Sequence, residues 1–160
     1  MFSIYKYLLY YENRGQKILL FFNLNMLFQL TVKTNKREEI IDITHQVNEY
    51  VKKSSAKNGL CIVYTPHTTT AITTNENYDP NVKTDILRFL NSSVPVNWGF
   101  SHDEGNSDAH IKSSLLGARE TYIINDGSLT LGTWQGILFC EFDGPRTRKV
   151  LIKFIGEDTL

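Results

Sequence analysis

Short strand-like runs that do not alternate regularly with helices constrain the fold of this chain most strongly. Alternating or strongly apolar runs lie at 27–34, 38–43, 60–65, 67–74, 121–125, 129–131, 136–142 and 149–155. Helical patterns lie at 44–56, at 80–90 and at 109–116, and Thr44, Asp79 and Asp108 are their expected N-caps. A mixed order of about eight strands and three short helices predicts one α+β domain with a largely antiparallel sheet or sandwich.

Charge and cysteine content narrow the class of protein. Lys and Arg together number 17, as do Asp and Glu, so the formal net charge of zero argues against a nucleic-acid partner. Cys61 and Cys140 each lie in an apolar strand-like run and are expected to be free, buried thiols in a reducing compartment. The longest uncharged run, 18–32, is too short for a membrane span, so we expect a cytoplasmic protein with no membrane partner.

The first 25 residues differ from the rest of the chain. They are rich in Tyr, Phe, Leu and Ile, but charged residues interrupt them, and no signal-peptide cleavage pattern follows an apolar core. A clean alternating run begins at Met26. We therefore expect residues 1–25 to be an N-terminal extension or the product of an upstream mis-start, and residues 26–160 to form the domain.

A polar loop between residues 101 and 114 concentrates groups that can bind ligands or transfer protons. It contains His102, Glu104, Asn106 and His110, together with two aspartates. So many such groups in one short loop favour a functional site. A solvated loop that ends in a helix cap is the structural alternative.

His67 follows a buried strand and the pair Thr65-Pro66, and Thr68 and Thr69 come directly after it. The threonine hydroxyls could orient the imidazole or bind an oxyanion, although a purely structural histidine would fit the same pattern. The spacing of His102 and His110 matches no short zinc motif, so a metal site would need a third ligand. His67, His102 and His110 are the candidate ligands of a catalytic divalent ion, zinc or magnesium.

The segment from Gly132 to Arg148 carries two acids and two arginines. Strand alternation puts Glu141 and Asp143 on one face, and Arg146 and Arg148 on one face of the next strand. Paired guanidinium groups suit phosphate or carboxylate binding, but a structural ion-pair cluster with the two acids fits equally well. In the same segment, Trp134 and Gln135 could line a pocket, and the alternative for the tryptophan is a place in the core.

Three segments of the sequence closely resemble the YjbQ family, often called secondary thiamine-phosphate synthases. They read PHTTTAITTNENYDPNVKTDILRFL, HDEGNSDAHIKSSLLG and LGTWQGILFCEFDGPRTRKVLIKFIGE, and the likeness extends from about Met26 to Asp158. The resemblance implies an α+β fold that forms homotrimers. It also implies that thiamine phosphate is made from a hydroxymethylpyrimidine diphosphate and a thiazole phosphate, with release of pyrophosphate.

The resemblance and the residue chemistry together give a set of expected roles. The three histidines fall on histidines of the family, and Asn75, Glu76, Trp134, Gln135 and Glu141 lie in its shared segments. We expect His67, His102 and His110 to hold the ion, and Glu141 or Glu104 to act as acid or base. The expected contacts to a small phosphorylated substrate are Thr68, Thr69, Asn75, Glu76, Asn106, Trp134, Gln135, Arg146 and Arg148.

Two other functions fit the same residues. A trimeric protein could bind a phosphorylated metabolite without turnover. A metal-dependent hydrolase would release phosphate or pyrophosphate without a second substrate, because an ion-bound water beside carboxylates would suffice.

Overall fold

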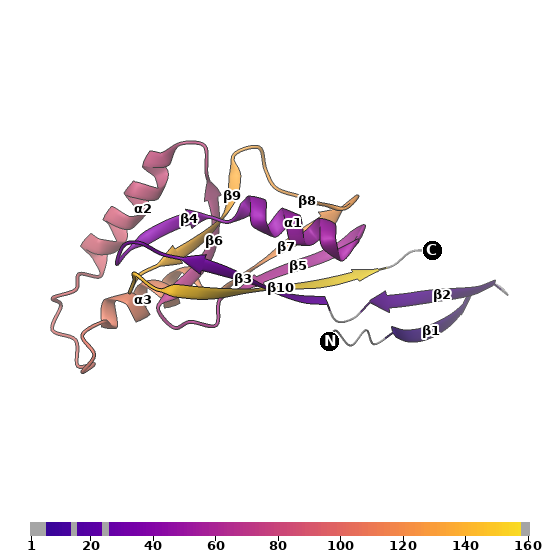
Figure 1. Cartoon of the computed structure of the whole chain (residues 1–160), viewed down its shortest axis with the longest axis horizontal. Coiled ribbons are helices and arrows are strands. Elements are labelled where there is room, and N and C mark those ends of the chain that lie inside the picture. The colour runs from indigo at the N-terminus through magenta and orange to yellow at the C-terminus, as the bar shows by residue number, and fades with distance from the viewer. Residues whose placement is uncertain (1–5, 14–15, 24–25, 158–160) are drawn as a thin grey trace.

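The computed structural model describes residues 6–13, 16–23 and 26–157 as a mixed α+β structure with antiparallel sheets and three helices (Figure 1). The five-stranded sheet has the order β3-β10-β5-β7-β8, and the three-stranded sheet the order β4-β9-β6. The elements from residue 26 onward are β3 Met26–Lys33, β4 Glu39–Asp42, α1 Thr44–Ser54, β5 Asn58–Tyr64, β6 Thr70–Glu76, α2 Pro80–Ser93, α3 Ser107–Leu116, β7 Arg119–Asn125, β8 Ser128–Leu129, β9 Gln135–Glu141 and β10 Thr147–Glu157. The predicted fold class is confirmed.

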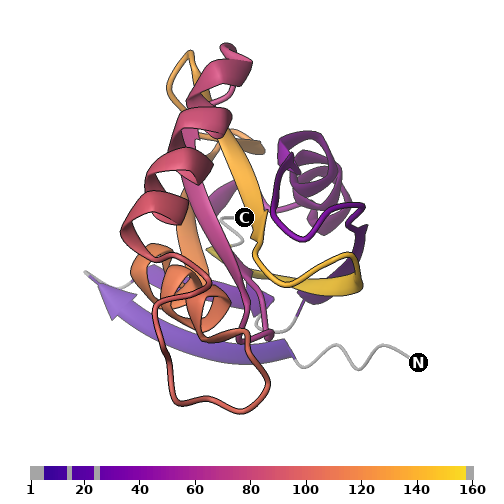
Figure 2. The same ribbon diagram turned by 90° about the vertical axis from the view of Figure 1, so that its left-hand side faces the viewer.

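Two apolar cores separate the layers. The larger core lies between the two sheets and α1, and it includes Val47, Val63, Phe139 and Ile152. The smaller core lies between the three-stranded sheet and helices α2 and α3, which stand on the opposite side of that sheet from α1 (Figure 2). Strand β9 is buried from Gly136 to Glu141 because both of its faces are covered, as expected for a strand between two layers.

The outer face of the five-stranded sheet carries apolar side chains that the described residues leave exposed. Ile155 pairs with Leu60, and Leu60 pairs with Ile123, so three exposed residues lie side by side across β10, β5 and β7. Leu27 and Tyr64 are exposed on β3 and β5 as well. This row is an apolar sheet surface on a domain whose other sheet face is already packed.

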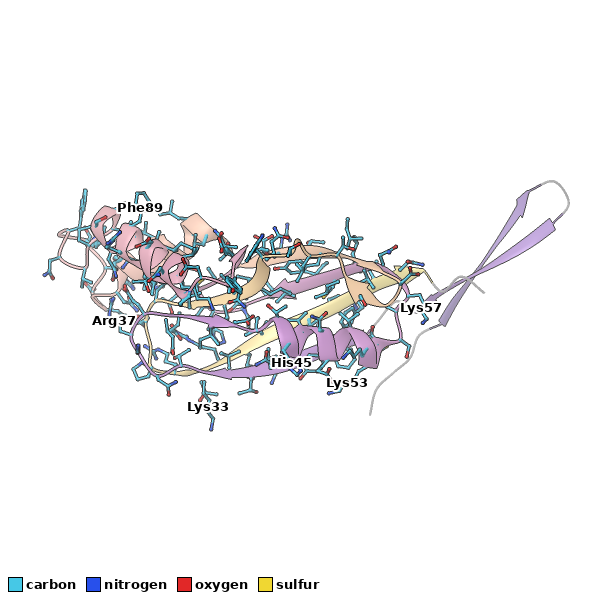
Figure 3. All side chains as sticks on the ribbon, turned by 90° about the horizontal axis from the view of Figure 1, so that it is seen from above. Lys33, Arg37, His45, Lys53, Lys57 and Phe89 are labelled. Atoms are coloured by element: carbon cyan, nitrogen blue, oxygen red, sulfur yellow. The ribbon has the colours of Figure 1, made fainter. Side chains whose placement is uncertain are left out.

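The first 25 residues contain two strands that the sequence analysis does not predict. β1 Lys6–Asn13 and β2 Gln16–Asn23 pair with each other as a separate antiparallel sheet. This hairpin projects away from the domain in Figures 1 and 3. The expectation that Met26 is the native start stays a prediction, and residues 1–5, 14–15 and 24–25 lie outside the described residues.

Several expected boundaries change for local reasons. Asp79 caps α2 as predicted, because its side chain accepts the backbone N–H of Asn81 at 2.8 Å. Thr44 is not a cap: Ile43 precedes α1, and the Thr44 hydroxyl instead accepts the N–H of Ile137. Asp108 is not a cap either, because α3 begins at Ser107, two residues before the expected start. The Asp108 carboxylate instead accepts hydrogen bonds from Arg37, in a distant segment, and from Lys112, one turn further along α3.

Strand β6 begins at Thr70 rather than at residue 67. Residues 66–69 form a turn because Pro66 cannot donate a backbone hydrogen bond to a neighbouring strand. Both cysteines are free and buried, as predicted, and burial raises the pKa of each thiol to about 12. No helix in the described part of the chain is both long and apolar enough to cross a membrane.

Candidate functional site

The turn before β6 holds His67 against the beginning of β10. The backbone N–H of Lys149 donates to Nε2 of His67 at 2.9 Å. Because Nε2 accepts this hydrogen bond, the neutral imidazole carries its proton on Nδ1. Burial and the positive charge of Arg148 lower the pKa of His67, so the neutral ring is favoured. His67 is thus oriented as a donor through Nδ1.

Next to His67, Glu141 and Arg148 form a buried, bidentate ion pair. Nε and Nη2 of Arg148 donate to the two carboxylate oxygens of Glu141, each at 2.6 Å. Nη2 also donates to the Thr69 hydroxyl at 3.0 Å. The Glu141 side chain is fully buried, and two backbone N–H groups, of Phe142 and Asp143, donate to it as well. Glu141 therefore holds Arg148 and the following turn in place, and its carboxylate does not face solvent.

The turn after β9 connects this pair to the polar loop before α3. Nη2 of Arg146 donates to Oδ2 of Asp143 at 2.8 Å, and the amide of Asn106 donates to the same oxygen at 3.1 Å. Oδ1 of Asn106 is buried and accepts no hydrogen bond within the described structure. Both arginines that we considered for phosphate binding are therefore in ion pairs, which is the structural alternative of the sequence analysis.

His102 and His110 come together at the beginning of α3. Their ring centroids are 5.3 Å apart, and Nε2 of His102 lies 3.8 Å from Oε2 of Glu104. They line a shallow pocket of about 320 Å³. Its other lining residues are Phe100, Ser101, Ser107 and Ile111. The pocket combines two imidazoles with apolar walls, which suits a planar ring that also forms hydrogen bonds.

The histidines do not assemble into the expected three-ligand metal site within one chain. Across residues 6–13, 16–23 and 26–157, no group of three or more His, Cys, Asp or Glu side chains is placed to hold a metal ion. His67 lies apart from this pair, and its Nε2 is already an acceptor for Lys149. Its Nδ1 carries the proton, so neither nitrogen of this ring offers a free lone pair to a cation.

Four predicted substrate contacts lie at the other end of the β6–β9 ladder. Thr70 pairs with Glu141 at one end, whereas Asn75 pairs with Gly136 and Glu76 with Gln135 at the opposite end. Six residues of strand separate the two ends, roughly 20 Å. Asn75, Glu76, Trp134 and Gln135 are thus distant from Glu141 in the same chain.

Trp134 is not a core residue, which corrects the structural alternative for this side chain. It is 56% exposed and packs edge-on against Tyr78, with ring centroids 5.0 Å apart. Its neighbour Gln135 turns back to accept the N–H of Gly132 at 2.8 Å. Near His67, Thr68 is exposed, whereas Thr69 is buried against Arg148.

A partly buried charge network beside α3 was missed by the sequence analysis. Its members are Arg37, Glu38, Asn91, Asp108 and Lys112. The side chains of Asp108 and Lys112 are fully buried and 3.0 Å apart. Their i, i+4 spacing on a predicted helix was a signal for a pair. Nothing in the local pattern pointed to Arg37, which lies 71 residues before Asp108.

Comparison with known proteins yields one family. The sequence model described as "UPF0047 protein YjbQ-like" matches residues 28–157. A UPF0047 protein of Methanocaldococcus jannaschii is 56% identical over 134 residues, which cover 84% of this chain and 97% of the relative. The UPF0047 protein YugU of Bacillus subtilis is 50% identical over 132 residues, or 82% of this chain and 100% of the relative.

Solved structures show the same fold. A crystal structure of a YjbQ/UPF0047 family protein from Clostridium acetobutylicum has a TM-score of 0.79 and 49% identity, and it covers 80% of this chain and 99% of that one. A YjbQ-like protein of unknown function from Sulfolobus solfataricus also has a TM-score of 0.79, at 34% identity, and it covers 82% of this chain and 96% of that one.

Proposed function

The chain belongs to the UPF0047 protein YjbQ-like family, and from its candidate site we propose that it is a transferase for phosphorylated heterocycles. Formation of thiamine phosphate would be a weak secondary activity. In that reaction a thiazole nitrogen attacks the methylene carbon of hydroxymethylpyrimidine diphosphate and forms a C–N bond. The C–O bond breaks, and its electron pair leaves with pyrophosphate.

The observation that carries this proposal is the placement of His67 beside the buried Glu141–Arg148 pair. Negative charge grows on the leaving oxygens as the C–O bond breaks, so a preorganised donor there lowers the barrier. The Nδ1–H of His67 is such a donor, and its ring is fixed by the Lys149 backbone N–H. In this scheme Glu141 is a positioning residue for Arg148 rather than the acid or base.

Arg146 is the better of the two arginines for a phosphate group. Its side chain is 53% exposed, whereas that of Arg148 is 8% exposed and fully engaged with Glu141 and Thr69. The exposed Thr68 hydroxyl adds a donor near His67. Asn106 offers a hydrogen-bond acceptor instead of a donor, because its buried Oδ1 receives no hydrogen bond from the described residues. A substrate N–H would satisfy this oxygen.

The pocket of His102 and His110 would take the heterocyclic part of the substrate. Its apolar walls, Phe100 and Ile111, favour a planar ring, and His110 or Glu104 could exchange a proton with it. A divalent ion remains a proposal for this histidine pair alone. No step of the scheme depends on the ion.

Assembly into a homotrimer is a second part of the proposal. The exposed row of Ile155, Leu60 and Ile123 would face the three-fold axis and bury apolar surface between the three copies. Assembly would also offer a way to bring Trp134 and Asn75 of one copy near the histidines of another. The two free, buried thiols fit a reducing compartment such as the cytoplasm.

Binding without turnover is the competing function, and one observation favours it. Both arginines are already paired with carboxylates, so little unpaired positive charge is left to stabilise a leaving group. The hydrolase alternative is weaker, because it needs an ion-bound water and the described residues of one chain form no three-ligand group.

Product formation with both substrates separates these functions. We expect slow release of pyrophosphate that requires the thiazole phosphate. His67→Ala should lower the maximal rate by about 10²–10³-fold, as expected when a preorganised hydrogen-bond donor to the leaving oxygens is lost. His110→Ala should also lower the rate without unfolding the protein.

His45→Ala is the matched control, because His45 is exposed on α1, outside the candidate site (Figure 3). A thermal shift with ligand but no product would support the binding protein instead. Pyrophosphate release without the thiazole would support the hydrolase, and an unchanged rate in His67→Ala would remove this ring from the mechanism.

A further inference from the structure

We propose that Arg37 is a positioning residue that joins the two halves of the candidate site. One half is the segment from Glu141 to Arg148. The other is the beginning of α3, with Asn106 and His110. This inference rests on the proposed function only in treating the two halves as one site. Figure 3 places Arg37 at the end of the domain where α2 and α3 lie.

The backbone of Arg37 holds the first half. Its carbonyl oxygen accepts the N–H of Gly144 at 2.9 Å. A Cβ atom on Gly144 would lie 2.4 Å from the carbonyl oxygen of Lys36 and 2.8 Å from Oγ1 of Thr34, so this turn packs directly on residues 34–37. Thr34 Oγ1 in turn accepts the N–H of Arg146 at 2.8 Å. The segment after Glu141 is therefore fixed to the Arg37 backbone.

The guanidinium of Arg37 holds the second half. Nη1 donates to Oδ2 of Asp108 at 3.0 Å, and Nη2 donates to Oδ1 at 2.8 Å. Asp108 is fully buried in the first turn of α3, two residues before His110. Burial opposes its charge, but hydrogen bonds from Arg37 and Lys112 outweigh this effect and lower the pKa of Asp108. This bidentate interaction fixes the orientation of α3 relative to Arg37 as well as its distance.

Behind Asp108, Lys112 completes the network. Its ammonium donates to Oε1 of Glu38 at 2.6 Å, to Oδ1 of Asn91 at 2.5 Å and to Oδ2 of Asp108 at 3.0 Å. The two cations, Arg37 and Lys112, balance the two carboxylates of Glu38 and Asp108. Every proton of the buried ammonium has an acceptor, so the network favours one arrangement of α3 against α2 and residues 37–38.

Two separate connections thus join the halves of the site. One runs through Arg37, and the other is the hydrogen bond between Asn106 and Asp143. Asn106 reaches Asp143 directly at 3.1 Å. Arg37 reaches the neighbouring Gly144 through its backbone and α3 through its side chain. Loss of the bidentate Arg37–Asp108 interaction should let the first turn of α3 move relative to Asp143 and His67. A displacement of about 1 Å at a site can lower the rate by 10²-fold.

The test compares Arg37→Met and Arg37→Lys with Arg88→Met. Arg88 is a matched control because it also pairs with an aspartate, Asp85 at 2.9 Å, but on the exposed face of α2. We expect kcat of Arg37→Met to fall about tenfold to hundredfold, with a smaller change in KM. The kcat of Arg37→Lys should be close to that of Arg37→Met, because lysine keeps the positive charge but cannot form the bidentate interaction with Asp108. Arg88→Met should behave like the wild type.

A second readout needs no activity. In NMR spectra, the ring signals of His110 and the side-chain amide signals of Asn106 should move in both Arg37 variants and stay in place in Arg88→Met. Absence of product from the wild type would count against the proposed function, while these signals would still decide the role of Arg37. Folded Arg37 variants with wild-type signals would overturn the inference. So would loss of folding in both variants, because Arg37 would then act on the whole domain.

Discussion

The Nε2 atom of His67 lies 2.9 Å from the backbone nitrogen of Lys149 and accepts its hydrogen bond. This contact ties the turn before β6 to the beginning of β10, 82 residues later in the chain. It also fixes the tautomer, since a ring that accepts at Nε2 and is neutral must carry its proton on Nδ1. Two predictions depend directly on this contact.

The first concerns stability as the pH falls from about 7 through the normal pKa of histidine, near 6.5, to the lowered pKa of His67. Burial and Arg148 lower the pKa of folded His67. Unfolded histidine binds a proton near pH 6.5. Below that pH the unfolded chain takes up a proton that the folded ring resists, so the free energy of unfolding falls as the pH falls. This decline ends below the lowered pKa of the folded state, where both states bind the proton.

Urea unfolding of wild type, His67→Gln and His45→Gln across this range checks the prediction. The difference between wild type and His67→Gln should grow in favour of the variant as the pH falls from 7. His45→Gln should follow the wild type, since His45 is exposed. Parallel curves for wild type and His67→Gln would show that the folded ring titrates normally.

The second prediction concerns metal. If His102 and His110 hold a divalent ion without His67, the ion survives removal of His67. We expect about one zinc per chain in wild type and in His67→Ala after loading with zinc, and its loss in His110→Ala. Elemental analysis after gel filtration measures this. Loss of zinc in His67→Ala would instead require the ring to rotate away from Lys149 and join the pair, and no zinc in any variant would end the metal hypothesis.

Local pattern was sufficient for much of the fold. The alternation in β3, the apolar run of β9 and the Asp79 cap depend on near neighbours, which the sequence displays directly. Asp108 shows where this reasoning fails. Its residue type fits an N-cap, but a partly exposed arginine from 71 residues away forms two hydrogen bonds to its buried carboxylate and stabilises its charge inside the protein.

The candidate site was predictable in its parts but not in its arrangement. His67 was singled out because it follows a buried strand and precedes threonine hydroxyls, and Glu141 and Arg148 because one segment holds two acids and two guanidinium groups. Which groups meet is decided by β-sheet register. The pairing of Thr70 with Glu141 brings the His67 turn to Arg148, and the same ladder carries Asn75 to its far end. A shift of register by one residue would have given another site.

The exposed row on the five-stranded sheet leads to a third prediction, for assembly. Ile123 is 59% exposed and lies beside Leu60. Burying one such side chain is worth roughly 1.5–3 kcal/mol. Ile123→Lys should therefore raise the dissociation constant of a homotrimer by tenfold or more in sedimentation experiments. Leu115→Lys on α3 is the control, because Leu115 is exposed but outside the row. A monomeric wild type, or equal assembly of both variants, would contradict the proposal.

The fourth prediction concerns the close approach of the paired strands β5 and β10 at Gly59. Gly59 pairs with Gly156 and has φ of +141°, which side chains rarely adopt. A Cβ atom there would lie 2.3 Å from the carbonyl oxygen of Ile155 and 2.6 Å from Cα of Gly156. Both are backbone atoms, so the strands themselves would have to separate. Gly59→Ala should therefore lower the free energy of unfolding by roughly 3 kcal/mol, from overpacking and backbone strain together.

Gly99→Ala separates those two contributions. Gly99 also has a positive φ, +83°, but nothing lies within 4 Å of a Cβ atom built there. Only backbone strain remains at this position, so we expect a loss of about 1 kcal/mol. Urea unfolding of the two variants gives the comparison. Equal losses would mean that β5 and β10 can move apart at Gly59 without cost, and the close approach of these strands would then not contribute to the stability of the five-stranded sheet.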